Sequence, residues 1–289
     1  MTKKIFSTVL AILMGTIGSA YAQGEHLRFS PGETPADGAL EIAVTEFTSP
    51  SDPEIKVTLY GVVHIADMSY YQQVQKDLAK FDTVLYEGIK PDEKPNQSTV
   101  LLNTMQKLFG DVLGLTFQKD GINYVQENYV HADISISELR EKMNGQPLTP
   151  LDGAISPETL ERVKPLLDVG TKLVKILMDN KPELRNSIKM QFGSQLGNSD
   201  ISKQLKPEMH KAIVLDRNQI VMDVLDRELE EKPTKKSIVI FYGAGHNADF
   251  VKRFKERGYT QTSKRWMTAW AVGAGAKDSE GPESQVEPR

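Results

Sequence analysis

The chain has 289 residues, no cysteine, and 35 basic against 39 acidic residues, which gives a formal net charge of −4. The lack of cysteine excludes a disulfide scaffold, so an ordinary apolar core must stabilise the fold. The acidic balance argues against nucleic acid as a partner.

The first residues have the three-part layout of a cleaved secretory signal peptide. Lys3 and Lys4 precede an apolar stretch over residues 5–17, and the small residues Ala20 and Ala22 mark a cleavage site. We expect a signal peptide over residues 1–22, export to the bacterial periplasm or beyond, and no stable membrane anchor after cleavage. An uncleaved anchor is the alternative, but the apolar stretch is short for a membrane span.

The next segments predict a strand–helix–strand unit. Residues 40–47 and 54–63 alternate apolar and polar side chains around the turn sequence SPSDP, which predicts a β-hairpin. Residues 67–81 carry apolar side chains at spacings of three and four, which predicts a helix. The apolar run 82–89 follows as a strand with the carboxylate of Glu87 near its end. Such a unit predicts parallel strands.

Residues 98–231 carry mainly helical patterns and are expected to form a large helical insert. Ser135 and Glu138 have the spacing of a capping box, and Pro157 follows Ser156 as a helix start would require. Helices are expected over residues 160–178, with a kink at Pro165, and over residues 207–231.

The last part of the chain returns to the sheet. Residues 237–242 form a continuous apolar run that predicts a strand buried on both faces, followed by a helix from residue 247 and a closing strand over 266–272. Residues 273–289 are polar and are expected to be a disordered tail. The prediction is one α/β domain over residues 23–272, with a central, mostly parallel sheet, flanking helices and the site at the carboxyl ends of the strands.

One motif occurs twice: residues 61–67 read GVVHIAD and residues 243–249 read GAGHNAD. Both place a histidine, His64 or His246, directly after a predicted strand, and we expect the glycines to let the chain turn sharply there. Glu87 ends a third strand. If the three strands are neighbours, two imidazoles and a carboxylate converge at the ligand-binding edge of the sheet.

This set of side chains suits a divalent metal ion. Imidazole and carboxylate ligands bind Mn, Co, Zn or Fe, and three protein ligands leave a position open for water or substrate. We therefore interpret His64, Glu87 and His246 as metal ligands. An alternative has Glu87 act as a general base while water fills its place on the ion.

The sequence leaves two possible roles open for several other residues. Asp67 and Asp249 are either acceptors that orient the histidines or helix N-caps. Glu87 alone could cap a turn or form an ion pair. His131 repeats the string His-Ala-Asp without the glycine, and it is a candidate for a further ligand or substrate contact from the insert. Spacing alone assigns no role to Arg217.

The order of these motifs resembles the TraB/PrgY/GumN family, which is similar to the Tiki metalloproteases and belongs with erythromycin-esterase-like and ChaN-like proteins. The resemblance covers about residues 55–272 and is carried by GVVH, VLYEG, DRNQIVMDVL and IVIFYGAGHNADFVKRFKERGY. Many relatives have GTxH where this chain has GVVH, so a threonine hydroxyl near the site is missing here.

The resemblance implies a divalent-metal-dependent hydrolase with His64, Glu87 and His246 in the site. It also implies that Arg217 of the Arg-Asn motif points into the same site, with Asn218 beside it as a further candidate. The expected reaction is attack of a metal-bound water on a carbonyl of a peptide or protein substrate, with Arg217 stabilising the negative charge that develops.

Two other functions are open. ChaN-like relatives bind haem or iron, so a non-enzymatic metal- or haem-binding protein is one alternative, with Tyr124, Tyr129 and His131 as the insert residues that suggest it. The other alternative is a catalytically inactive interaction module on the same fold.

Overall fold

The computed structural model describes residues 24–90, 97–144, 146, 157–198 and 206–273. The predicted signal peptide, Ser156 and the polar tail after Gly273 lie outside the described residues. Among the described residues, no helix is both long and apolar enough to cross a membrane.

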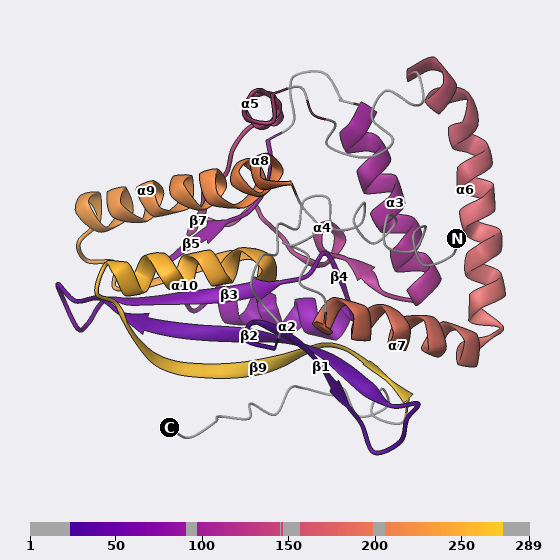
Figure 1. Ribbon diagram of the computed structural model, residues 1–289, viewed down its shortest axis with the longest axis horizontal. Helices are drawn as coiled ribbons and strands as arrows, with labels where there is room; N and C mark the ends of the chain where they lie inside the picture. Colours follow the sequence, from indigo (N-terminus) through magenta and orange to yellow (C-terminus); the bar gives the residue numbers. More distant parts are fainter. Residues whose placement is uncertain (1–23, 91–96, 145, 147–156, 199–205, 274–289) are drawn as a thin grey trace.

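A seven-stranded sheet forms the centre of the molecule, with helices on both of its faces (Figure 1). This confirms the predicted α/β class with a central, mostly parallel sheet. Along one path the strand order is β1-β2-β3-β8-β5-β7, and β9 pairs with β2 away from that path. The strand bounds are β1 Leu27–Pro31, β2 Gly38–Thr48, β3 Lys56–Val62, β5 Thr83–Tyr86, β7 Tyr129–His131, β8 Ser237–Gly243 and β9 Thr260–Val272.

The strands that carry the histidines and Glu87 form the parallel part of this sheet. β3 pairs with β8, β8 with β5, and β5 with β7, all in parallel. The predicted hairpin is confirmed as the antiparallel pair β2 and β3. β9 begins earlier than the sequence indicated and pairs with the full length of β2 in antiparallel orientation.

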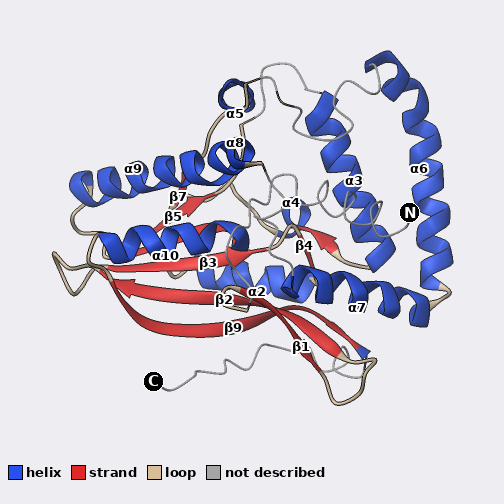
Figure 2. Cartoon of the chain, in the orientation of Figure 1, coloured by secondary structure: helices blue, strands red, loops and turns tan. Residues whose placement is uncertain are grey.

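The two faces of the sheet are buried under different helices (Figure 2). On one face, α9 (Asp216–Glu231) and α10 (Asn247–Glu256) pack Val221, Leu225 and Phe250 against the sheet. On the other face, α2 (Met68–Leu78) and α7 (Pro182–Asn198) contribute Tyr71 and Phe192. Strands such as β8 are buried on both faces, which explains their continuous apolar sequence.

The segment predicted as a helical insert is mostly helical. It contains α3 (Gln97–Leu113), α4 (Gln118–Gly121), α5 (Ile136–Lys142), α6 (Pro157–Asp179), α7, α8 (Pro207–His210), a π-helical turn (Lys211–Leu215) and α9. Ser135 caps α5 with the predicted capping box. The segment also supplies β7 to the main sheet, and β6 (Thr116–Phe117) pairs with β4 (Ile65–Ala66) in a second, two-stranded sheet. No alternating pattern marked these short strands.

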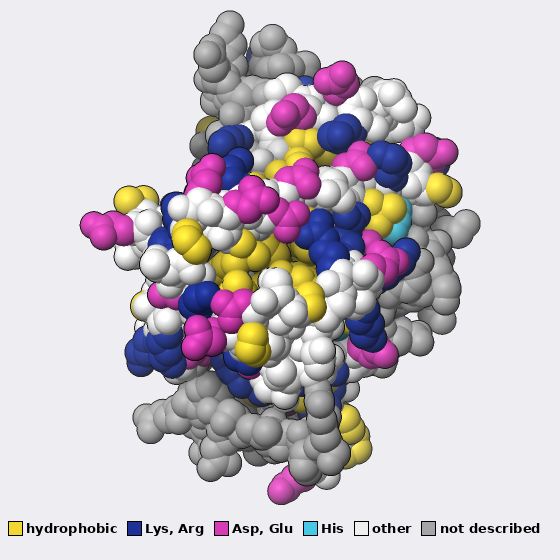
Figure 3. Space-filling view, turned by 90° about the vertical axis from the view of Figure 1, so that its left-hand side faces the viewer, with side chains coloured by type: hydrophobic (Ala, Val, Ile, Leu, Met, Phe, Trp, Pro, Cys, Tyr) yellow, Lys and Arg dark blue, Asp and Glu magenta, His cyan; other side chains and the backbone are white. Residues whose placement is uncertain are grey.

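Figure 3 shows the side of the molecule where the parallel strands begin. Basic and acidic side chains are interspersed there around exposed hydrophobic atoms. At the start of β8, Lys236 forms an ion pair with Asp52 of the β2–β3 turn. The histidines and Glu87 lie at the opposite, carboxyl ends of the strands.

Candidate functional site

Three neighbouring strands bring His64, Glu87 and His246 to the same edge of the sheet. Val62, the last residue of β3, is in register with Gly243, the last residue of β8. Tyr86, the last residue of β5, is in register with Phe241 of β8. Glu87 follows β5 directly, His64 follows β3 after Val63, and His246 ends the 3-10 turn Ala244–His246 after β8. The expectation that the three strands are neighbours is therefore confirmed.

The glycines of the two motifs permit close contacts rather than sharp turns. Neither Gly61 nor Gly243 has a positive φ. A Cβ atom on Gly61 would lie 2.8 Å from Ile42 Cγ2 and 2.9 Å from Asn247 Nδ2. One on Gly243 would lie 3.2 Å from Oε2 of Glu87, to which the Gly243 N–H donates at 2.6 Å. The predicted reason for these glycines was wrong: each leaves room for a side chain from another part of the site.

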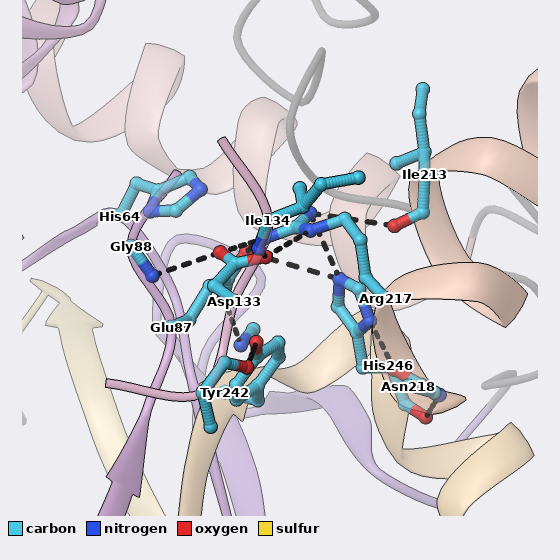
Figure 4. A network of polar contacts seen from close by, with 12 residues as sticks. His64, Glu87, Gly88, Asp133, Ile134, Ile213, Arg217, Asn218, Tyr242 and His246 are labelled. Atoms are coloured by element: carbon cyan, nitrogen blue, oxygen red, sulfur yellow. Dashed lines mark hydrogen bonds and ion pairs between the residues drawn. The ribbon is translucent and has the colours of Figure 1, made fainter. Parts of the chain in front are cut away.

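Arg217 lies at the centre of the polar network (Figure 4). Its guanidinium donates to both carboxylate oxygens of Asp133, each at 2.8 Å, and to Oε1 of Glu87 at 2.7 Å. The side chains of Arg217 and Asp133 are 0% exposed and that of Glu87 is 6% exposed. Burial acts to lower the pKa of Arg217, but Asp133 and Glu87 outweigh it and hold that pKa above its ordinary value.

All five N–H groups of Arg217 have an acceptor. Besides the three bonds to carboxylates, Nη1 donates to the carbonyl of Ile213 at 3.4 Å and lies 3.5 Å from Nε2 of His246. A guanidinium has five donors and no acceptor. The side chain therefore organises the two carboxylates, and only the Nη1 N–H that faces His246 would lose its acceptor if Nε2 of that histidine held an ion. This arrangement favours a positioning role for Arg217 over the charge stabilisation expected from the sequence.

His246 is held in one orientation and one tautomer. Its Nδ1 lies 2.6 Å from Oδ1 of Asn218, an oxygen that can only accept, so Nδ1 carries the proton and Nε2 the lone pair. That Nε2 atom lies 3.8 Å from Oε1 of Glu87. Burial lowers the pKa of His246 well below its ordinary value, and the positive charge of Arg217 adds to this effect, so the imidazole is neutral.

His64 is held in the same manner at the end of β3. Its Nδ1 lies 3.0 Å from Oε1 of Gln118, whose Nε2 donates to the Tyr124 hydroxyl at 2.8 Å. Burial lowers the pKa of His64, while the nearby charge of Glu87 acts to raise it. His64 is only partly buried, unlike His246. An amide oxygen thus fixes the tautomer of each motif histidine, as metal-binding histidines require.

The other predicted residues fall at different distances from this network. Asn218 contacts His246 directly, and Asp249 accepts from Asn218 Nδ2 at 2.9 Å, one contact further away. Asp67 lies at the N-cap position of α2 without a side-chain capping bond and faces Lys189 at 3.5 Å, outside the network. His131 donates from Nε2 to the Gly88 carbonyl at 2.5 Å, so it supports the loop after β5.

Sequence reasoning missed Asp133, the residue that forms two hydrogen bonds with Arg217. It also accepts from the backbone N–H groups of Gly88 and Ile134. The signal was present, because Asp133 ends the string His-Ala-Asp that drew attention to His131. Tyr242 was also missed: its ring packs at 5.1 Å against that of His246, and its hydroxyl donates to the Ala132 carbonyl.

The donor set fits a divalent ion in two respects. Both imidazoles are neutral and have the lone pair on Nε2, and the cluster combines one guanidinium with two carboxylates, so its net charge is negative. A third ligand is not assembled. Oε1 of Glu87 is paired with Arg217, and among the described residues no three His, Cys, Asp or Glu side chains are arranged to hold a metal ion. His64 and His246 fit as ligands, whereas Glu87 would have to exchange its contact with Arg217 or act beside the ion.

Comparisons with known proteins add no assignment to this geometry. No family model, no curated protein and no solved structure matches the chain.

Proposed function

We propose that the protein is an exported hydrolase of the TraB/Tiki type that uses a divalent metal ion and acts on peptide bonds. The observation that carries this proposal is the pair of neutral imidazoles, each fixed through Nδ1 by an amide oxygen, at adjacent strand ends beside Glu87. Such pre-set imidazoles are typical of metal sites. The two occurrences of G-x-x-H-x-A-D then have one purpose, which is to supply the two ligands.

His64 and His246 would hold the ion through their Nε2 atoms, with Mn, Co, Zn or Fe as the candidate metals. When bound, such an ion lowers the pKa of a coordinated water and polarises a carbonyl. The contact between Glu87 and Arg217 favours the alternative in which Glu87 accepts a proton from the attacking water and is not a permanent ligand.

The remaining residues of the network would keep this site rigid and dry. The Gly243 N–H and Arg217 hold the two carboxylate oxygens of Glu87 in fixed directions. Asp133 accepts hydrogen bonds from Arg217 and fixes its position. The ring of Tyr242 packs against that of His246. A carboxylate fixed at both oxygens meets the reacting water with little loss of entropy.

The test is elemental analysis of the purified wild type beside three variants, His64→Ala, His246→Ala and His131→Ala, combined with a peptide-library cleavage screen. We expect the first two variants to lose bound metal and cleavage together. His131→Ala is the matched control, because its Nε2 is already bonded to Gly88, and it should keep both. Equal metal content in all four proteins would contradict the proposal.

A haem- or iron-binding function is the second candidate, and one observation favours it. The rings of Tyr86, Tyr124, Tyr129 and His131 gather beside Glu87, with Tyr86 5.2 Å from Tyr124 and 5.4 Å from His131. Absorbance of the purified protein decides this case, since bound haem gives a Soret band. An inactive interaction module instead predicts that neither histidine substitution changes metal content or phenotype.

A further inference from the structure

The proposed reaction needs a hydrogen-bond donor for the substrate oxygen on which negative charge develops. The donors of the Arg217 network are largely engaged. Four N–H groups of Arg217 donate to Asp133, Glu87 and the Ile213 carbonyl, and the fifth faces Nε2 of His246. The Gly243 and Gly88 N–H groups donate to Glu87 and Asp133. A donor outside this network that reaches the same edge of the sheet is therefore a candidate.

The Tyr124 hydroxyl has the required free proton. Oε1 of Gln118 faces the protonated Nδ1 of His64, so the other end of this amide is its NH₂ group. That group donates to the Tyr124 oxygen at 2.8 Å, so the hydroxyl is the acceptor there. In the part of the chain that the structure describes, the hydroxyl hydrogen of Tyr124 has no acceptor of its own.

The position of Tyr124 and the retained proton of its hydroxyl suit a hydrogen-bond donor to a substrate. Its ring lies 5.2 Å from that of Tyr86 and 6.5 Å from that of Phe241, which holds it beside the ends of β5 and β8. The side chain is only partly buried. Burial raises the pKa of the Tyr124 hydroxyl, and the charge of Glu87 raises it further, so the proton stays in place at physiological pH.

We propose that Tyr124 is a catalytic residue whose hydroxyl donates a hydrogen bond to the carbonyl oxygen of the bound substrate. The inference rests on the proposed hydrolase function. No proton needs to be transferred: the hydrogen bond strengthens as charge builds on the oxygen and weakens as the carbonyl reforms. Gln118 then has two tasks, since it fixes the tautomer of His64 with one end and directs the proton of Tyr124 with the other.

The experiment compares wild type, Tyr124→Phe and Tyr259→Phe on a peptide from the library screen, with kcat and KM measured separately. Tyr124→Phe removes the hydroxyl and keeps the ring. We expect kcat to fall about 10²- to 10³-fold, as for other lost oxyanion donors, with KM nearly unchanged. Tyr259→Phe is the control, since the Tyr259 hydroxyl is hydrogen-bonded to Ser49 and its ring packs on Phe254, outside the site; it should keep wild-type kcat.

The possible results separate the two proposals. A wild type that cleaves no peptide overturns the hydrolase function and this inference with it. An active wild type and an equally active Tyr124→Phe overturn only the role of Tyr124. Thermal unfolding checks that the variant is folded; if it is not, 3-fluorotyrosine at position 124 keeps the fold and alters the acidity of the hydroxyl. A changed kcat then supports the inference, and an unchanged kcat overturns it.

Discussion

Arg217 and Glu87 form a buried ion pair, with Nη2 of the guanidinium 2.7 Å from Oε1 of the carboxylate, although 130 positions separate them in the sequence. The same guanidinium binds both oxygens of Asp133. A buried charge is costly unless its partners satisfy it completely, and here they do. Through Glu87 and Asp133, Arg217 connects α9 to the segments that follow β5 and β7. The stability of the fold and the geometry of the site therefore depend on this one residue.

Arg217→Lys should destabilise the protein by about 3 kcal/mol or more, because one ammonium cannot replace a planar guanidinium between two buried carboxylates. Denaturant unfolding measures the effect. Arg257→Lys is the matched control: it also changes an arginine that contacts an aspartate, Asp226, but at the surface. That control should cost less than about 1 kcal/mol. Equal losses in the two variants would contradict the central role of Arg217.

Gly61→Ala should destabilise the protein by about 1–3 kcal/mol, because the added methyl group has no space between Ile42 and Asn247. Gly170→Ala, in α6, is the control, since a Cβ there meets nothing within 4 Å. It should be neutral or stabilising by up to about 1 kcal/mol, as expected for glycine in a helix interior. Thermal or urea unfolding compares the two, and a Gly61→Ala variant as stable as Gly170→Ala would refute the close contact.

Asn218→Asp should raise the pKa of His246. The aspartate keeps the shape of the side chain but places a negative charge next to Nδ1–H, which stabilises the protonated ring. It also puts an acceptor where Asn218 Nδ2 donates to Asp249 and to the His246 carbonyl, so the folded variant should be less stable than wild type. The ¹⁵N and ¹H shifts of the imidazole followed against pH report the change. Gln219→Glu adds the same charge on the exposed side of the same helix and should leave the pKa of His246 where it is. An unchanged pKa in Asn218→Asp would show that Asn218 and His246 are not in contact in solution.

The protein should lose stability in mild acid. Burial lowers the pKa of His26 to about 4, and Lys264 and Lys255 contribute, whereas the unfolded chain has the ordinary value of 6.5. Between these values the unfolded state binds more protons, so the free energy of unfolding falls as the pH falls. The slope reaches about 1.4 kcal/mol per pH unit for this one group.

Replacing His26 isolates its share of this acid sensitivity. His26→Gln removes the titrating group, so the free energy of unfolding should fall less steeply between pH 6.5 and about 4 than in wild type. His64 and His246, whose pKa values are also lowered, keep their contributions in the variant. Parallel stability curves for the two proteins would rule out a buried neutral His26.

Much of this fold could be predicted because the spacing of apolar side chains along the chain and the apolar content of a segment are local properties. The β2–β3 hairpin, α2, α10 and the buried strand β8 were predicted close to their observed bounds. β1 and β7 were missed because each is short, and the pairing partner of each, β2 or β5, is what makes it a strand. The capping box at Ser135 was predicted correctly, since four consecutive residues contain the whole motif.

The sequence by itself determined which residues stand at the strand ends, because His64, Glu87 and His246 each follow an apolar run. Only the tertiary structure decided how they are used. The contact between Glu87 and Arg217, the partnership of Asp133 with Arg217, and the engagement of every Arg217 donor join segments far apart in the chain. A local pattern carries no information about such pairings, since they depend on which helix packs over which strand end.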